Sequence, residues 1–378
     1  MTILRLPVIR TALTALVATM TIAAACGGGS LTPSPAPSDI AAPSASVAAR
    51  TSATTAAPTA TPKATPAPVY WPLTGVLADD PARTKRRPLN VRLPNDPSAR
   101  PQVGLAKADI VFEMIVEGGI TRYSAVFHSQ DPKAVGPTRS YRFSDLHLTQ
   151  MLRGALVASG ATIEERDAVT NSIRSGNMVS VDAERDGRGY YRVGGRGGLN
   201  NLFIDPEVVR RSVNDAGGSG PVDVPALAFF PSLEHDVMTG GFTSSTAAAK
   251  VTLPLRDPST FTYDAASRGY RRSQAGAQTI DPDGDVPILA RNVIVIHTDI
   301  WETSVIEDIY GSKGLDYRMT GEGKAEIFRD GRRVDGTWKR AGPLDMFTFY
   351  DPSGEQILLE PGQSWIHFLL PTATVTSE

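Results

Sequence analysis

The sequence has little of several features that carry common protein functions. It holds one cysteine, Cys26, in 378 residues, so no internal disulfide can form and the fold must rest on its core. Its formal net charge is −2 and it has no basic stripe, which disfavours nucleic-acid binding. The five histidines show no HxxxH or HxH spacing, and no Gly-x-Ser-x-Gly elbow occurs. We therefore expect neither a bound metal nor a cofactor.

Long apolar runs are also scarce, and the first one is short. Residues 11–25 form an uncharged, apolar run of 15 residues after Arg5 and Arg10, whereas a membrane-spanning helix needs roughly 20. Small residues precede Cys26, and a cysteine directly after a signal-peptidase cut can become a lipid anchor. The segment resembles a bacterial lipobox. It predicts a signal peptide over residues 1–25 and a lipid on Cys26 at the outer face of the cytoplasmic membrane. The alternative is an ordinary cleaved signal with an incidental cysteine.

The composition divides the rest of the chain into a linker and a body. Residues 26–69 are mostly Ala, Pro, Ser and Thr, and such a segment cannot bury enough apolar surface to order itself. It is predicted to be a disordered tether. The remaining residues, about 300, suffice for one large or two average domains. The Gly-rich residues 217–221 predict a boundary between an N-terminal domain, residues 70–216, and a C-terminal domain, residues 222–372.

The N-terminal part reads as α/β. Residues 109–117 predict a buried strand, Gly118-Gly119 a hairpin turn and residues 121–128 the paired strand. Helices are expected over residues 144–156, with Ser144 as N-cap, and over residues 161–175. Residues 183–201, rich in Gly and Arg, are expected to form a loop. We thus expect an α+β protein whose first part combines a strand hairpin with helices.

The C-terminal part reads mostly as strands. Asp330-Gly331 is its clearest hairpin signal, and Trp338 and Trp365 are expected in the core. The strand candidates are residues 249–255, 260–263, 269–272, 292–298, 325–328, 332–339, 346–350 and 364–370.

One group of charged residues could carry a function. Arg139 and Arg142 lie in a turn expected between a strand and a helix, where backbone N–H groups and the helix dipole favour an anion. Arg122, on the neighbouring strand, could converge on them, and guanidinium groups suit phosphate or carboxylate. The four-residue spacing of three acids places them on one face, where they could hold a metal or pair with these arginines; they are Asp109, Glu113 and Glu117. A structural ion-pair network, an anion-binding site and a catalytic site all remain open.

A second arginine group stands among glycines. The segment 182–198 is most simply a solvated loop, but it could fold over the Arg139 region as a lid; its arginines are Arg185, Arg188, Arg192 and Arg196.

Several blocks of the sequence are similar to one known family. The N-terminal blocks are RPQVGLAKADIVFE at 100–113, EGGITR at 117–122 and VGPTRSYR at 135–142. The C-terminal blocks are GEGK at 321–324, RDGRRVDGTWK at 329–339 and PGQSWI at 361–366. In this order they resemble the YerB-like lipoprotein family, built from the two parts of domain of unknown function 3048. The resemblance implies a two-part α+β body and supplies no activity. The family tends to show a His in the turn where this chain reads VASGA at 157–161, so no role of that His is carried over.

Three function classes follow from the sequence. The first is a membrane-anchored lipoprotein that binds an envelope glycan, an anionic ligand or an envelope protein. The second is an enzyme that acts on a phosphorylated or acidic envelope molecule, with Arg139, Arg142 and Arg122 holding the anion. The third is a structural scaffold. An open cleft lined by the arginines would favour the first two, and mutual pairing of these side chains would favour the third.

Overall fold

The computed structural model describes residues 67–378. The predicted signal peptide, the lipidation site Cys26 and the tether as far as residue 66 lie outside the described residues. Within residues 67–378, no helix is both long and apolar enough to cross a bilayer.

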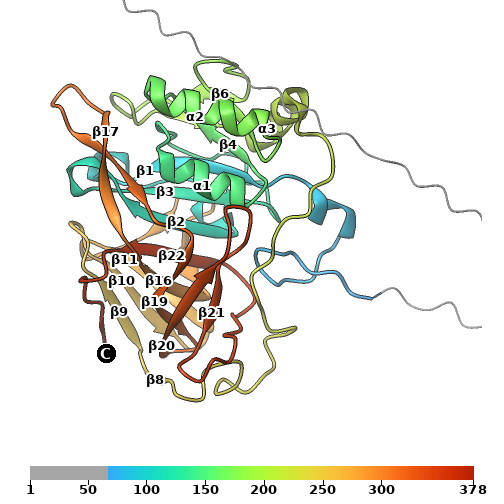
Figure 1. Cartoon of the computed structure of the whole chain (residues 1–378), viewed down its shortest axis with the longest axis vertical. Coiled ribbons are helices and arrows are strands. Elements are labelled where there is room, and N and C mark those ends of the chain that lie inside the picture. The colour runs from blue at the N-terminus through green and yellow to red at the C-terminus, as the bar shows by residue number, and fades with distance from the viewer. Residues whose placement is uncertain (1–66) are drawn as a thin grey trace, which may run out of the picture. The chain divides into compact units, whose positions relative to one another are not determined.

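One large mixed sheet organises the body (Figure 1). Ten of its 11 strands form one continuous path. The remaining strand, β8 (Thr246–Ala247), lies off this path and pairs with its strand β20. In spatial order the path is β21 (Thr348–Tyr350), β20 (Arg332–Arg340), β19 (Gly321–Arg329), β16 (Asn292–His297), β22 (Ser364–Leu369), β2 (Ile110–Ile115), β3 (Thr121–Phe127), β1 (Leu89–Pro94), β4 (Ala155–Ala158) and β5 (Val179–Asp182).

The sheet joins the two halves of the chain. Strand β22, near the C-terminus, runs parallel to β2 on one side and to β16 on the other. These central strands carry buried apolar side chains at nearly every position, as expected for strands covered on both faces. The two halves therefore share one core, and the predicted domain boundaries remain a prediction.

A smaller sheet and three short hairpins complete the strands. The second sheet contains β12 (Ala277–Gln278), β11 (Gly269–Gln274), β10 (Ser259–Asp264), β9 (Lys250–Leu253), β23 (Thr376–Ser377) and β15 (Leu289–Ala290). The two-stranded pairs are β6 (Tyr190–Arg192) with β7 (Leu202–Ile204), β13 (Ile280–Asp281) with β14 (Val286–Pro287), and β17 (Ile300–Ile306) with β18 (Lys313–Tyr317).

Two apolar clusters lie on opposite faces of the large sheet. One joins it to the smaller sheet through residues such as Val111, Phe261 and Trp365. The other contains Leu148 of the first helix and Trp338 of β20. Both tryptophans are fully buried, which confirms their predicted core positions.

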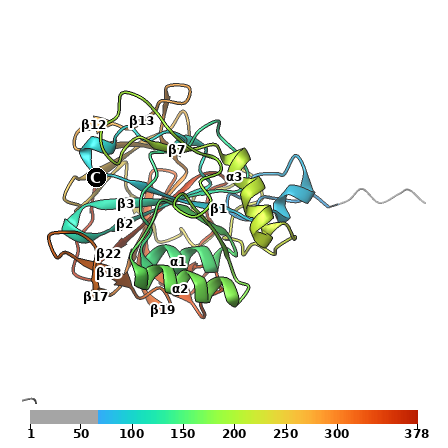
Figure 2. The ribbon, with the colours of Figure 1, turned by 90° about the horizontal axis from the view of Figure 1, so that it is seen from above.

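The helices are α1 (Phe143–Met151), α2 (Ile163–Arg174) and α3 (Pro206–Val213), and α1 and α2 lie side by side (Figure 2). The first predicted helix was too long, because the chain leaves it after Met151. Arg153 adopts a left-handed φ of 49°, and residues from Ala155 form β4 instead. Its N-cap is Arg142 rather than Ser144. The second predicted helix is confirmed as α2, with Thr162 as its cap.

The predicted α+β body with a strand-rich second part is confirmed. Each strand candidate of the second half overlaps an observed strand, and both glycine-marked hairpins occur, at β2–β3 and β19–β20. The expected loop 183–201 was wrong in part, since residues Tyr190–Arg192 form β6 and pair with β7.

Candidate functional site

The first part of the site is an edge of the large sheet where parallel strands end. Strands β1, β4 and β5 are mutually parallel neighbours. Ser159 follows β4, and Ala183 and Glu184 follow β5. In open α/β sheets, ligands bind outside the carboxyl ends of such strands, because the loops diverge there and leave a crevice.

The pocket at this edge has a volume of ≈ 620 Å³, which lies in the range of small-molecule binding sites. It joins three segments: the residues leading to α1, the loops after β4 and β5, and the β6–β7 hairpin. The lining includes Arg139, Ser140, Ser159, Tyr190, Tyr191 and Arg192. We call it the Arg139 pocket. The Gly- and Arg-rich segment thus lies against Arg139, as one of the two expectations for it proposed, but Arg192 is the one of its four arginines in the lining.

The backbone holds Arg139 firmly at this edge. Its N–H donates to the carbonyl of Arg92 in β1 (3.0 Å), and its carbonyl accepts from the N–H of Ser159 (3.0 Å). Its half-buried side chain has no carboxylate within ion-pair distance among residues 67–378, and its Nε is buried without a hydrogen-bond partner there. Burial lowers the pKa of Arg139, while Asp96 opposes this effect. An arginine keeps its charge under such a shift, so the pocket holds an uncompensated cation.

The β6–β7 hairpin adds aromatic surface. The hydroxyl of Tyr190 donates to two backbone carbonyls, of Ala158 (3.0 Å) and Val181 (2.7 Å), so this ring is fixed against the ends of β4 and β5. Tyr191 is 40% exposed. Arg192 donates to the side chain of Asn201 and remains exposed. The pocket therefore combines guanidinium donors with a tyrosine face.

The other two predicted arginines lie in a buried ion-pair network. Glu117 accepts from Arg122 (2.7 Å) and from Arg142 (2.5 Å) through one oxygen. Arg142 also faces Glu307 (3.1 Å) and Glu165 (3.9 Å). Because the charges of these arginines and glutamates neutralise one another, the arrangement fits a structural ion-pair network better than an anion-binding site. Of Arg122, Arg139 and Arg142, Arg139 alone lines the pocket.

Asp109 and Glu113 do not pair with these arginines, which corrects that expectation for two of the three acids. Register pairs Glu113 with Tyr123 and Met114 with Arg122, so Glu113 and Arg122 point to opposite faces of the sheet. Glu113 instead meets Arg272 of β11 at 3.4 Å. Asp109 accepts from the backbone N–H of His128 and of Ser129. Glu117 lies beyond β2, which ends at Ile115, and strand alternation no longer sets its direction.

No sequence pattern pointed to Glu307. It follows β17 on a hairpin from the C-terminal half, and its side chain is 1% exposed against Arg142. Burial raises the pKa of Glu307 to about 8; Arg142 opposes the rise, and the carboxylates of Glu165 and Glu117 add to it. The pKa of Glu165 is also raised, mainly by burial. One proton shared by Glu165 and Glu307 would balance this network at neutral pH.

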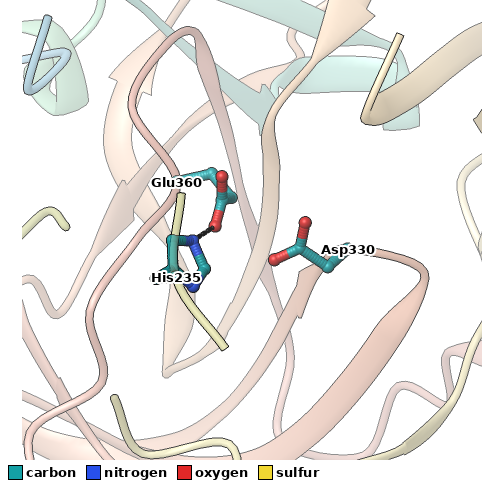
Figure 3. Close-up of side chains that lie close together, drawn as sticks. All are labelled: His235, Asp330 and Glu360. Carbon is teal, nitrogen blue, oxygen red and sulfur yellow. Dashed lines mark hydrogen bonds and ion pairs between the residues drawn. The ribbon is translucent and has the colours of Figure 1, made fainter. Parts of the chain in front are cut away.

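A histidine and two carboxylates meet in the C-terminal half (Figure 3). The ligand atoms of His235, Asp330 and Glu360 all lie within 4.8 Å of one another. However, Arg268 and Arg329 each lie 3.0 Å from a different oxygen of Asp330. A divalent cation would have to displace both guanidinium groups, so the arrangement fits a salt-bridge cluster better than a metal centre.

Comparison with known proteins identifies both halves of the chain. The N-terminal domain of "Protein of unknown function (DUF3048)" matches residues 73–219, and the C-terminal domain matches residues 249–366. "Putative lipoprotein YerB" of Bacillus subtilis (strain 168) is 26% identical over 299 residues, covering 79% of this chain and 85% of that protein. The crystal structure of YerB protein from Bacillus subtilis superposes with a TM-score of 0.68 at 25% identity, covering 82% of this chain and 100% of that one.

Proposed function

We propose that this chain, which belongs to the family built from the N- and C-terminal DUF3048 domains, is a lipid-anchored envelope protein that binds an anionic sugar in the Arg139 pocket. The sequence around Cys26 and the lipoprotein name of the Bacillus relative support the anchor. Neither the family description nor that name gives an activity. The ligand therefore has to be argued from the chemistry of the pocket.

The observation that carries the proposal is the uncompensated charge of Arg139. Its neighbours Arg122 and Arg142 are matched by Glu117, whereas Arg139 faces an open pocket with no such partner among the described residues. The pocket's carboxylate, Glu184, is already paired with Arg166. A bound carboxylate or phosphate would supply the missing counter-charge to the Arg139 guanidinium.

The aromatic wall narrows the class of ligand. A tyrosine face packs well against the apolar face of a sugar ring, while its rim stays polar. Tyr191 lines the pocket and is partly exposed, and Ser140, Ser159 and Thr138 are also lining residues that carry hydroxyl groups. A sugar that carries a carboxylate or phosphate satisfies both features, whereas a neutral sugar leaves Arg139 unmatched. Binding alone explains these contacts, so the proposal includes no catalytic step.

A thermal-shift screen tests this function. The probes are N-acetylmuramic acid, a sugar phosphate and inorganic phosphate, with N-acetylglucosamine as the neutral counterpart. We expect stabilisation by the anionic sugars and none by the neutral sugar, and Arg139→Ala should abolish the shift. Arg185→Ala is the matched control. Arg185 lies in the glycine-rich segment 182–198, which contributes other residues to the pocket, but its own side chain is exposed and does not line the pocket. A flat profile with every anion would contradict the proposal.

A further inference from the structure

An exposed apolar hairpin opens the described part of the chain. The N–H of Trp71 donates to Val76 (2.8 Å), that of Ala78 donates to Val69 (2.8 Å), and Tyr70 and Leu77 form a bridge. Trp71 points inward and is 3% exposed. Leu73 is also buried, whereas four further large apolar side chains of this hairpin face solvent, with exposures of 38% to 59%: Val69, Tyr70, Val76 and Leu77. We call residues 69–78 the entry hairpin.

A basic pocket adjoins the entry hairpin. It has a volume of ≈ 380 Å³ and is lined by Lys85, Arg86, Arg87, Arg210 and the turn after α3. The guanidinium groups of Arg83 and Arg86 both lie 5.8 Å from the ring of Trp71, which fixes the pocket beside the hairpin. Figure 2 shows the same neighbourhood, with the blue start of the described chain close to α3.

The acidic residues nearby offset only part of this positive charge. Asp131 is shared by Arg86 (2.6 Å) and Arg210 (2.7 Å), with Arg83 at 3.9 Å. Lys85 pairs with Asp223, and both are exposed. Asp79 lies 3.8 Å from Arg83, and Asp80 caps the short helix η1 (Pro81–Lys85).

Two more arginines of this surface donate to backbone carbonyls instead of carboxylates. Arg87 donates to the carbonyl of Arg153 (2.8 Å), and Arg153 donates to that of Asp223 (3.0 Å). The Nε of Arg87 is buried and has no hydrogen-bond partner among residues 67–378. This surface therefore keeps an excess of cations and a donor that points at no protein acceptor.

We propose that the entry hairpin and the basic pocket form a docking surface for the anionic phospholipid bilayer that carries the anchor. The apolar side chains would enter the interfacial layer, and the arginines and lysine would contact lipid phosphates. Apolar residues flanked by cations bind such a layer because burial and charge attraction add together. This inference rests on the lipid anchor of the proposed function and is independent of the Arg139 pocket.

The position of the surface supports a bilayer as its occupant. Forty residues separate Cys26 from Ala67, where the described chain begins, two residues before the entry hairpin. A random-coil tether of this length would have an average end-to-end distance of about 35 Å. An anchor at that distance keeps the hairpin at a high effective concentration next to the membrane, so a weak contact suffices.

Vesicle flotation with residues 65–378 tests the inference without the anchor. This fragment is one compact unit, separate from residues 1–64, and it contains both apolar clusters and every described strand. Vesicles of phosphatidylcholine alone are compared with vesicles that also contain phosphatidylglycerol. We expect binding to the anionic vesicles, weakened by salt, and at least about tenfold less binding to the neutral ones.

Two variants of the surface and two controls decide the result. Leu77→Asp and the double change Lys85→Glu/Arg87→Glu should each reduce binding at least about tenfold. Ile309→Asp and Lys313→Glu make the same kinds of change on the exposed β17–β18 hairpin, which both views place away from the entry hairpin, and should leave binding unchanged.

Equal binding to both vesicle types would overturn the inference. So would unchanged binding of Leu77→Asp, an exposed site at which misfolding is not expected. Loss of sugar binding in Arg139→Ala would not bear on either outcome.

Discussion

The shared proton between Glu165 and Glu307 makes the stability of the protein depend on pH in a defined direction. Glu307 is buried against Arg142 with its pKa raised to about 8, from an ordinary value of 4.5. In the unfolded chain Glu307 loses its proton near its ordinary pKa, whereas the folded protein retains it up to about pH 8. The contribution to stability is therefore complete below pH 4.5, declines as pH rises and is lost once pH exceeds about 8.

Glu307→Gln removes this titration and keeps the shape of the protonated side chain. A pKa difference between 4.5 and about 8 corresponds to at most about 5 kcal/mol. Because Arg142 and the hairpin can rearrange as the charge forms, we expect about 1 to 3 kcal/mol. The variant should match the wild type at pH 5 and exceed its free energy of unfolding by that amount at pH 8.5.

Urea unfolding at a series of pH values measures this difference. Glu302→Gln is the matched control: Glu302 lies on the same hairpin, but its side chain is 66% exposed and pairs with Lys313 at the surface. The Glu302 variant should follow the wild-type profile at every pH. Parallel profiles for the wild type and Glu307→Gln would refute the shared-proton reasoning.

Two further predictions concern the core and the anchor. Glu113 is buried with a pKa lowered to about 2, because the attraction of Arg272 and contacts with His367 and Thr121 outweigh the effect of burial. Its carboxylate therefore stabilises the fold above pH 4.5, and that stability is lost as pH falls toward 2. Glu113→Gln should cost about 3 to 5 kcal/mol at pH 7 by leaving Arg272 unpaired, and should flatten the acid limb of the unfolding profile; an unchanged acid limb would contradict this assignment. For the anchor, mass spectrometry of the mature protein should find an acylated Cys26 at its N-terminus, and Cys26→Ser should release the protein from membranes; an unmodified thiol would refute the anchor.

Local patterns predicted the elements whose partners lie close in sequence. Gly118-Gly119 and Asp330-Gly331 mark real hairpins, because the backbone conformation of a short turn depends on residues close in sequence; the first turn spans residues 116–120 and the second residues 330–331. The parallel pairing of β22 with β2 joins residues about 250 positions apart and leaves no such local signal. The early end of α1 depends on Arg153, a residue whose left-handed conformation the composition does not reveal.

In the candidate site, too, local patterns were predictable from the sequence and long-range contacts were not. The arginine block at 139–142 was visible in the sequence, yet its two arginines have different surroundings: Arg142 is matched by Glu117 and Glu307, whereas Arg139 faces the pocket. Strand alternation correctly separates the faces of β2, but it does not say which arginine approaches from β3 or β11. Glu307 reaches Arg142 from a distant hairpin, so only the three-dimensional structure brings it into the network.

Isothermal titration of an anionic sugar that shifts the melting temperature, into wild type and Arg139→Ala, tests the central claim most directly. A hydrogen bond to a charged group such as a guanidinium contributes about 1.5 to 3 kcal/mol, so the variant should bind about 10- to 100-fold more weakly. The Arg185→Ala control should keep the wild-type affinity. Equal affinities for wild type and Arg139→Ala would show that the ligand binds elsewhere and would contradict the assignment of the Arg139 pocket.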